Sequence, residues 1–193
     1  STDADIYLYN TTTGTTKNLC KPVGYVEPEI DACHSMKDQA VNSAENLKNN
    51  PGYDVNPKFS PDGQYISWQS MARNGYESDR NRLCVYNLAS GNKTYVTEAF
   101  DSNVDNYCWN TDSRSLYFMG CWHACINIYK TNLQGQIKQI TEGWNDYASL
   151  DIINNGKQLL TLRQSISQAN EIYIVSPGKE KNAKVQQISF ENK

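Results

Sequence analysis

The 193-residue sequence lacks the features that mark several large classes of protein. No apolar run approaches the roughly 20 residues that a membrane-spanning helix needs, so we predict no transmembrane helix and no membrane partner. Charged residues make up only 20%, the net charge is −3, and Lys and Arg form no basic stripe. Nucleic-acid binding depends on clustered Lys and Arg, so nucleic acid is not expected as a partner.

No secretion signal is visible at the start of the sequence, because no basic segment followed by an apolar one occurs there. Two explanations stay open: a signal peptide was removed, or the sequence begins inside a longer chain.

Short catalytic motifs are also missing. The sequence contains no Gly-x-Ser-x-Gly elbow, no Gly-x-Gly-x-x-Gly or Walker loop, and no His-Glu-x-x-His motif. Its two histidines, His34 and His123, have no Ser or Cys partner at a recognisable spacing. We therefore assign no catalytic residue and expect no cofactor.

The six cysteines are too few for a disulfide-built miniprotein of this length. Cys121 and Cys125 flank three residues of an expected hairpin loop, where a disulfide is geometrically feasible. Together with His123 they lack the paired Cys-x2-Cys spacing of a zinc site, so we expect no metal there and favour structural cysteines, reduced or bridged. Cys84 and Cys108 lie within strand patterns, where a small buried side chain is the simplest interpretation.

Uncharged polar residues and tyrosine dominate what is present. There are 22 Asn, and 13 Tyr against 4 Phe, while hydrophobic residues make up 38%. An aromatic content of 11% argues against disorder. Turn-forming Asn and Gly combined with Tyr, Ile and Val predict many short strands joined by tight turns, which is an all-β composition.

The strongest signal is an internal repeat. One unit, an apolar strand, a tight turn and a second apolar strand, occurs at 58–68, 108–118 and 151–161. The other unit is a hairpin that occurs at 5–20, 82–97, 127–141 and 171–189. Between full repeats, corresponding residues are 43 to 50 positions apart.

Turn chemistry supports both units. In Ser60-Pro61-Asp62-Gly63, Pro presets the backbone angle at the second position and Gly accepts the positive φ that follows. Asn154-Asn155-Gly156 serves the same purpose in a later copy. Four strands in about 45 residues, with no helix between them, is the pattern of a β-propeller blade. An ordinary β-sandwich would not repeat its turns at matching offsets.

Counting strands predicts a partial propeller of about three and a half four-stranded antiparallel blades, with a short helical insertion. A half blade covers 4–20, and full blades cover 53–99, 103–143 and 147–190. Propellers close with four to eight blades, so we expect a fragment of a longer chain. The unpaired half blade would leave an exposed edge strand, which opens a route to self-association.

The remaining segment, 21–52, is predicted to be an insertion with a helix near 36–48. An apolar stripe at helical spacing should pack onto the propeller; it consists of Met36, Ala40, Ala44 and Leu47.

In the predicted propeller, the longer loops all lie on one face, and the candidate substrate contacts come from these loops. The loop over 71–81 offers Tyr76, Glu77 and Arg80, and the turn over 121–125 offers Trp122 and His123. The alternatives are an internally salt-bridged loop tip in the first case and surface aromatics without a function in the second.

Residues 56–68, Asn-Pro-Lys-Phe-Ser-Pro-Asp-Gly-Gln-Tyr-Ile-Ser-Trp, resemble the propeller repeat shared by TolB and the prolyl oligopeptidase family of serine peptidases. The stretch over 69–83 is similar to the propeller of bacterial dipeptidyl and acylaminoacyl peptidases of that family. Residues 187–192 resemble a final propeller strand. The resemblance covers the chain except for the insertion.

This resemblance implies an α/β-hydrolase domain elsewhere in the parent chain, with the propeller gating and positioning short peptides. It also implies a periplasmic or secreted bacterial protein. Relatives such as dipeptidyl peptidase IV read the substrate's amino terminus with a pair of Glu residues, which is missing here; Glu77 is the nearest candidate by position. The alternative is a non-enzymatic TolB-like propeller that binds a protein or glycan partner.

Overall fold

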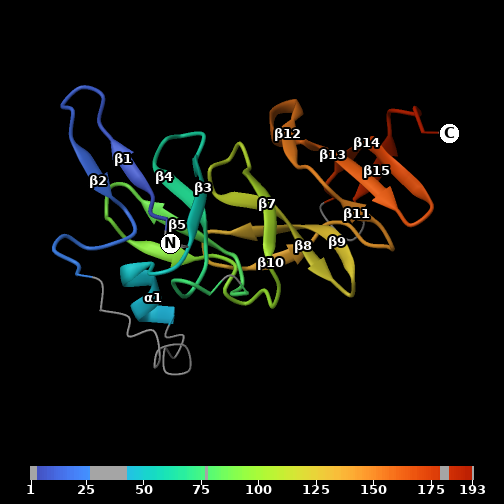
Figure 1. Ribbon diagram of the computed structural model, residues 1–193. Helices are drawn as coiled ribbons and strands as arrows, with labels where there is room; N and C mark the ends of the chain where they lie inside the picture. Colours follow the sequence, from blue (N-terminus) through green and yellow to red (C-terminus); the bar gives the residue numbers. More distant parts are fainter. Residues whose placement is uncertain (1–3, 27–42, 77, 179–182, 193) are drawn as a thin grey trace.

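The computed structural model describes residues 4–26, 43–76, 78–178 and 183–192. Within them the chain forms four antiparallel sheets of two to five strands and one short helix, arranged in a row from the N-terminus to the C-terminus (Figure 1). The predicted all-β, partial-propeller fold is confirmed.

The row begins with the N-terminal hairpin, β1 (Tyr7–Tyr9) and β2 (Thr16–Asn18). The first sheet consists of β3 (Asp54–Phe59), β4 (Tyr65–Ser70), β5 (Arg82–Asn87) and β6 (Lys93–Tyr95). The middle sheet consists of β7 (Val104–Trp109), β8 (Ser115–Trp122), β9 (Cys125–Asn132) and β10 (Ile137–Gln139).

The C-terminal sheet differs because two short strands, β11 (Asp146–Tyr147) and β12 (Asp151–Ile153), share one edge of β13. They take the place of a single inner strand. The turn η1 (Asn154–Gly156) follows, and the sheet continues with β13 (Gln158–Ser165), β14 (Gln168–Ser176) and β15 (Lys184–Gln187).

The high asparagine content is partly explained by the outer hairpins. Each of three hairpins starts its turn with an Asn whose side-chain oxygen accepts hydrogen bonds from backbone N–H groups two to four residues ahead; they are Asn10, Asn87 and Asn132. A glycine at positive φ completes each turn: Gly14, Gly91 and Gly135. These local bonds replace ladder bonds that the chain loses as it reverses.

Both faces of the sheets carry apolar side chains, because each inner sheet is covered on two sides. Along β8, Leu116 and Phe118 face the first sheet, whereas Tyr117 and Met119 face the C-terminal sheet. A third cluster, centred on Trp68, joins the first sheet to the N-terminal hairpin. The core is thus a series of layers between stacked sheets.

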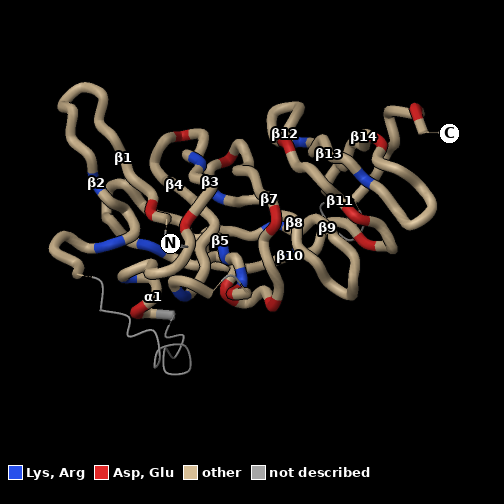
Figure 2. The backbone as a smooth tube through the Cα atoms, in the orientation of Figure 1, with Lys and Arg blue, Asp and Glu red and all other residues tan. Residues whose placement is uncertain are grey.

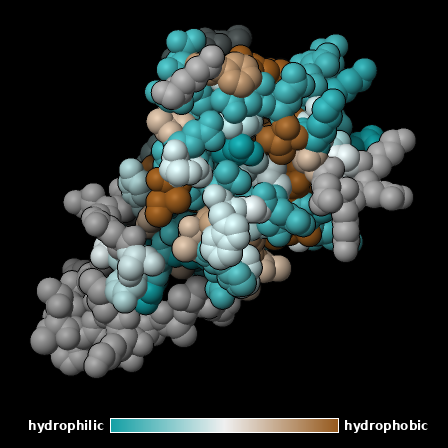
Figure 3. All heavy atoms as spheres, turned by 90° about the vertical axis from the view of Figure 1, so that its right-hand side faces the viewer, coloured by the Kyte–Doolittle hydropathy of each residue, from teal (hydrophilic) through white to brown (hydrophobic). Residues whose placement is uncertain are grey.

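Two surfaces of the stack are uncovered by other described strands. β1 pairs only with β2 at its edge, which is the feature behind the predicted self-association. At the other end, cross-strand pairs place four aliphatic side chains on the outer face of the C-terminal sheet: Leu160, Leu162, Ile172 and Ile174. Figure 3 views this end and shows hydrophobic patches among hydrophilic residues.

The helix α1 (Ser43–Asn49) lies in the later part of the predicted helix, and residues 36–42 lie outside the described residues. Leu47 packs on the hairpin cluster as expected, whereas Ala44 is exposed. The buried contacts come instead from polar side chains: Asn46 donates to Ala72 O, and Asn50 donates to Tyr95 Oη at 3.0 Å. No helix in the described part of the chain is long and apolar enough to cross a membrane.

Candidate functional site

Bulges interrupt the inner strands of the first and middle sheets at corresponding places. The ladder shifts between Val55 and Lys58 in β3, and between Val104 and Asn106 in β7. Asn56 adopts a φ of 54°, which Asn tolerates better than most residues. The two bulges form a cavity of about 530 Å³ that is lined by Asn56, Pro57, Lys58, Gln69, Asp105, Asn106 and Tyr107.

Most of the polar groups in this cavity are already bonded. The Lys58 ammonium donates to Tyr107 O and lies 4.7 Å from the centre of the Tyr107 ring. Gln69 donates to Val104 O and accepts from Asn56 Nδ2. These bonds fix the walls of the cavity and leave one ionisable group without a partner.

That group is Asp105, whose carboxylate has no hydrogen bond or ion pair with any described residue. It remains accessible to solvent, yet the cavity walls exclude enough water to raise the pKa of its carboxyl group. A carboxylate in this state favours a cationic ligand, because an incoming positive charge replaces the lost hydration.

The sequence-based candidates did not include Asp105. A usable signal was present: Phe59 and Trp109 correspond in the repeat, so Asn56 corresponds to Asn106. In both strands an Asn stands three residues before an aromatic residue, within the bulge of β3 and at the end of the bulge of β7.

The loop over 71–81 is held mainly by its own side chains. Arg73 forms a two-pronged ion pair with Asp79, and its guanidinium lies 3.7 Å from the centre of the Tyr76 ring. Arg80 donates to Phe100 O and lies 3.6 Å from Glu98 Oε1. Two of the candidate contacts, Tyr76 and Arg80, therefore have structural partners. The third, Glu77, lies outside the described residues.

Trp122 and His123 form an exposed aromatic pair at the end of the β8–β9 hairpin. Their ring centres are 4.8 Å apart at an interplanar angle of 20°, and Trp122 is 50% exposed. The turn is tighter than expected, with only His123 and Ala124 between the strands. Both residues have positive φ, 52° and 61°, a conformation that usually calls for Asn-Gly. No hydrogen bond, ion pair or ring contact within the described residues joins this pair to Tyr76 or Arg80.

The same hairpin explains why Cys121 and Cys125 do not form a disulfide. Cys121 lies opposite Ile126 and Cys125 lies opposite Trp122, so the two thiols point to opposite faces of the hairpin. The cysteines within the described residues are all free thiols, and Cys33 lies outside them.

One group of side chains has the composition of a metal site. Asp5, Cys20 and Asp54 bring their ligand atoms within 4.8 Å of one another at the junction of the N-terminal hairpin and the first sheet. Burial raises the pKa of Asp54 to about 7 and raises the pKa of Cys20 as well. The sequence analysis predicted no metal ligand here, because the three residues are far apart in the chain and form no local motif.

Comparison with known proteins finds no matching family model. Among curated proteins, dipeptidyl-peptidase 5 of Porphyromonas gingivalis is 39% identical over 194 aligned residues, covering all of this chain and 24% of that protein. Dipeptidyl-peptidase 5 of Porphyromonas endodontalis is 37% identical, covering 90% of this chain and 21% of that protein. The chain thus spans less than a quarter of the length of these relatives.

Solved structures show the same fold at low sequence identity. The β-propeller domain of the trilobed protease from Pyrococcus furiosus matches 98% of this chain and 46% of its own, with a TM-score of 0.61 and 16% identity. Acylaminoacyl peptidase from Pyrococcus horikoshii matches 96% of this chain and 22% of its own, with a TM-score of 0.60 and 15% identity.

TolB from Acinetobacter baumannii matches 97% of this chain and 38% of its own, with a TM-score of 0.58 and 15% identity. Stacked four-stranded sheets, repeated turns and these matches agree with one another. The chain is a β-propeller segment related to dipeptidyl-peptidase 5, a peptidase of the prolyl oligopeptidase type.

Proposed function

We propose that this chain is the propeller part of a periplasmic or secreted serine exopeptidase that removes dipeptides or acylated residues from short peptides. The alignment with dipeptidyl-peptidase 5 over the whole chain carries the proposal. Chemistry would take place in an α/β-hydrolase domain of the same parent chain, and the propeller would gate and position the peptide.

Within the propeller, the Asp105 cavity is the best-placed contact for a peptide. Its unpaired carboxylate suits the ammonium group of a free amino terminus, and the side-chain amide nitrogen of Asn106, also in the cavity lining, suits a peptide carbonyl. Asp105 thereby takes the role for which the sequence suggested only Glu77. Trp122 and His123 would supply an apolar wall for a side chain of the peptide.

Kinetics of the parent enzyme test this assignment. Asp105→Asn should lower kcat/KM about 10- to 100-fold for a dipeptidyl reporter with a free amino terminus, the equivalent of one charge-assisted hydrogen bond. The same reporter with an acetylated amino terminus should be unaffected. Asp101→Asn, in an exposed loop outside the cavity, is the matched control. Equal losses with both reporters would remove Asp105 from amine recognition.

Affinity should also depend on pH with a defined sign. Because a bound ammonium requires an ionised Asp105, KM for the free-amine reporter should rise as the pH falls through the raised pKa of Asp105. The isolated 193-residue chain should not hydrolyse either reporter.

A non-enzymatic propeller that binds a protein or glycan is the second candidate, and the TolB match over 97% of the chain favours it. The parent reading frame distinguishes the two. A Gly-x-Ser-x-Gly elbow downstream of residue 193 supports the peptidase, whereas further blades followed by a stop codon support the binding protein.

A further inference from the structure

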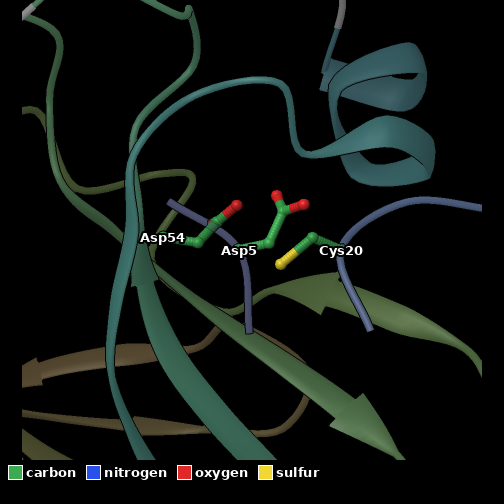
Figure 4. A group of neighbouring side chains, drawn as sticks. All are labelled: Asp5, Cys20 and Asp54. Atoms are coloured by element: carbon green, nitrogen blue, oxygen red, sulfur yellow. The ribbon is translucent and has the colours of Figure 1, made fainter. Parts of the chain in front are cut away.

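Three side chains from separate segments converge where the N-terminal hairpin meets the first sheet (Figure 4). Asp5 precedes β1, Cys20 follows β2, and Asp54 begins β3. Backbone hydrogen bonds hold the segments together: Leu19 N donates to Ile6 O and Asp54 N donates to Ala4 O, both at 2.9 Å. The position of the three side chains is therefore set by the fold.

This group contains an unsatisfied buried oxygen. Asp54 is 1% exposed; its Oδ1 accepts from Trp68 Nε1 at 2.9 Å, but its Oδ2 has no hydrogen-bond partner in the described residues. Buried carboxylate oxygens are normally paired or bound to a metal ion. The unpaired oxygen of Asp54 is thus an observation, separate from the clustering, that points to a missing ligand.

The other two members are prepared for the same ligand. Cys20 is fully buried, and its Sγ accepts from Ile6 N at 3.1 Å, which fixes the sulfur in the group. Burial raises the pKa of this thiol, so a cation that binds here must displace the thiol proton. Asp5 accepts from Asn18 Nδ2 at 2.7 Å and lies 3.2 Å from Lys21 Nζ. Hydrogen bonds of this kind orient metal-binding side chains.

Ligand chemistry selects the metal. A thiolate with two carboxylate oxygens suits zinc, whereas calcium and magnesium prefer an all-oxygen set. Zinc binds sulfur at about 2.3 Å and oxygen at about 2.0–2.2 Å, so tetrahedral ligands lie roughly 3.5 Å apart. The present separations, all within 4.8 Å, need only small side-chain rotations to reach that geometry.

Charge also balances. One thiolate and two carboxylates carry three negative charges, and a zinc ion together with the Lys21 ammonium neutralises them. The Lys93 ammonium also lies within electrostatic range of the three side chains, while its own hydrogen bonds go to Cys20 O, Lys48 O and Asn50 Oδ1. Figure 2 shows basic residues near β2 and α1 and acidic residues near the N-terminus.

We propose that Asp5, Cys20 and Asp54 bind a zinc ion that fastens the N-terminal hairpin to the first sheet. The fourth position would take water from the side of Asp5, whose side chain is 11% exposed. This site has no part in the proposed peptidase activity, and either proposal can fail without the other.

Titration of the chelator-treated 193-residue chain with Zn²⁺ alone tests the site, with calorimetry for affinity and elemental analysis for stoichiometry. We expect one ion per chain and a higher Tm when it binds. Asp54→Asn and Asp5→Asn should each weaken binding at least tenfold. Cys108→Ser, which alters another buried thiol, should leave binding unchanged.

Cobalt provides an independent readout, because a bound thiolate gives a charge-transfer absorption band. The band should be present in the unmodified chain and in Cys108→Ser, and absent in Cys20→Ser. If Cys20→Ser fails to fold, Asp5→Asn decides the question, since Asp5 is partly exposed and its replacement leaves the core intact. Unchanged affinity in Asp5→Asn, absence of binding in the unmodified chain, or loss of binding in Cys121→Ser would each overturn the proposal.

Discussion

The first sheet is covered on both faces, and its two junctions are built from different chemistry. Toward the middle sheet, the contact is mainly apolar and aromatic, apart from the polar bonds of Lys58 and Gln69 at the Asp105 cavity. Phe100, Phe118 and Tyr129 pack there with ring centres 4.8 to 5.4 Å apart. Gly120 is required there, because a Cβ atom would lie 2.4 Å from the Phe100 ring.

On the opposite face, toward the N-terminal hairpin and α1, the junction combines an apolar cluster with buried polar and ionisable groups. Arg82 is buried against the Tyr95 ring at 3.8 Å, donates to Asn46 Oδ1, and donates to Glu98 Oε2 at 3.1 Å. Burial lowers the pKa of Lys93 in the same region. An apolar junction keeps its strength across pH and ionic conditions, whereas a junction of buried charges depends on their protonation and on bound ions.

The largest effect is expected at the apolar junction. Phe118→Ala should lower the free energy of unfolding by about 3–5 kcal/mol, because it removes a fully buried ring from an aromatic cluster. Urea unfolding measures the change, and Phe190→Ala, at a site 58% exposed, should cost far less. The decrease in the free energy of unfolding should be the same with zinc or chelator present. A decrease that depends on zinc would show that the two junctions are not independent.

The polar junction should instead respond to pH. In chelator-treated protein, the raised pKa of Asp54 means that the folded chain binds more protons than the unfolded chain between about pH 4 and pH 7. The contribution of Asp54 to stability is therefore largest below this range and is lost as the pH rises through it, by up to about 4 kcal/mol. Asp54→Asn should flatten the profile measured by urea unfolding. A wild-type profile that rises over this range would contradict the assignment.

The smallest effect lies outside both junctions, in the β8–β9 turn. Replacing His123-Ala124 with Asn-Gly should raise the free energy of unfolding by about 1 kcal/mol, because those residues accept positive φ at less cost. Thermal unfolding should show a higher Tm for this variant, in which both junctions are unchanged. If Tm falls, His123 makes a stabilising contact that outweighs the strain of the turn.

Strands and turns were predictable because their signals are local. Gly63 and Gly91 occupy turns at positive φ, and Leu116 and Tyr117 alternate between two buried faces, as a stacked sheet requires. The helix was less predictable. Its apolar stripe predicted that it packs onto the propeller, but the buried hydrogen bonds are made by Asn46 and Asn50. The sequence alone does not show which Asn side chains are buried and bonded.

The candidate site was predictable only in part. Loop position suggested Tyr76, Arg80, Trp122 and His123 as substrate contacts, which stay predictions. It did not show that Arg73 and Asp79 hold the first loop together by an ion pair. The sequence did not predict Asp105 as a site residue, because the cavity around its side chain is formed by two bulges in different strands.

By itself, the sequence determined the repeat, the strand-and-turn pattern and the propeller fold, because each depends on residues within one hairpin. Only the tertiary structure decided which polar residues meet. Asp5, Cys20 and Asp54 come together across almost 50 positions, since stacking a hairpin on a sheet brings distant segments into contact. The same stacking determines which charges lose water, and therefore which side chains are left in need of a ligand.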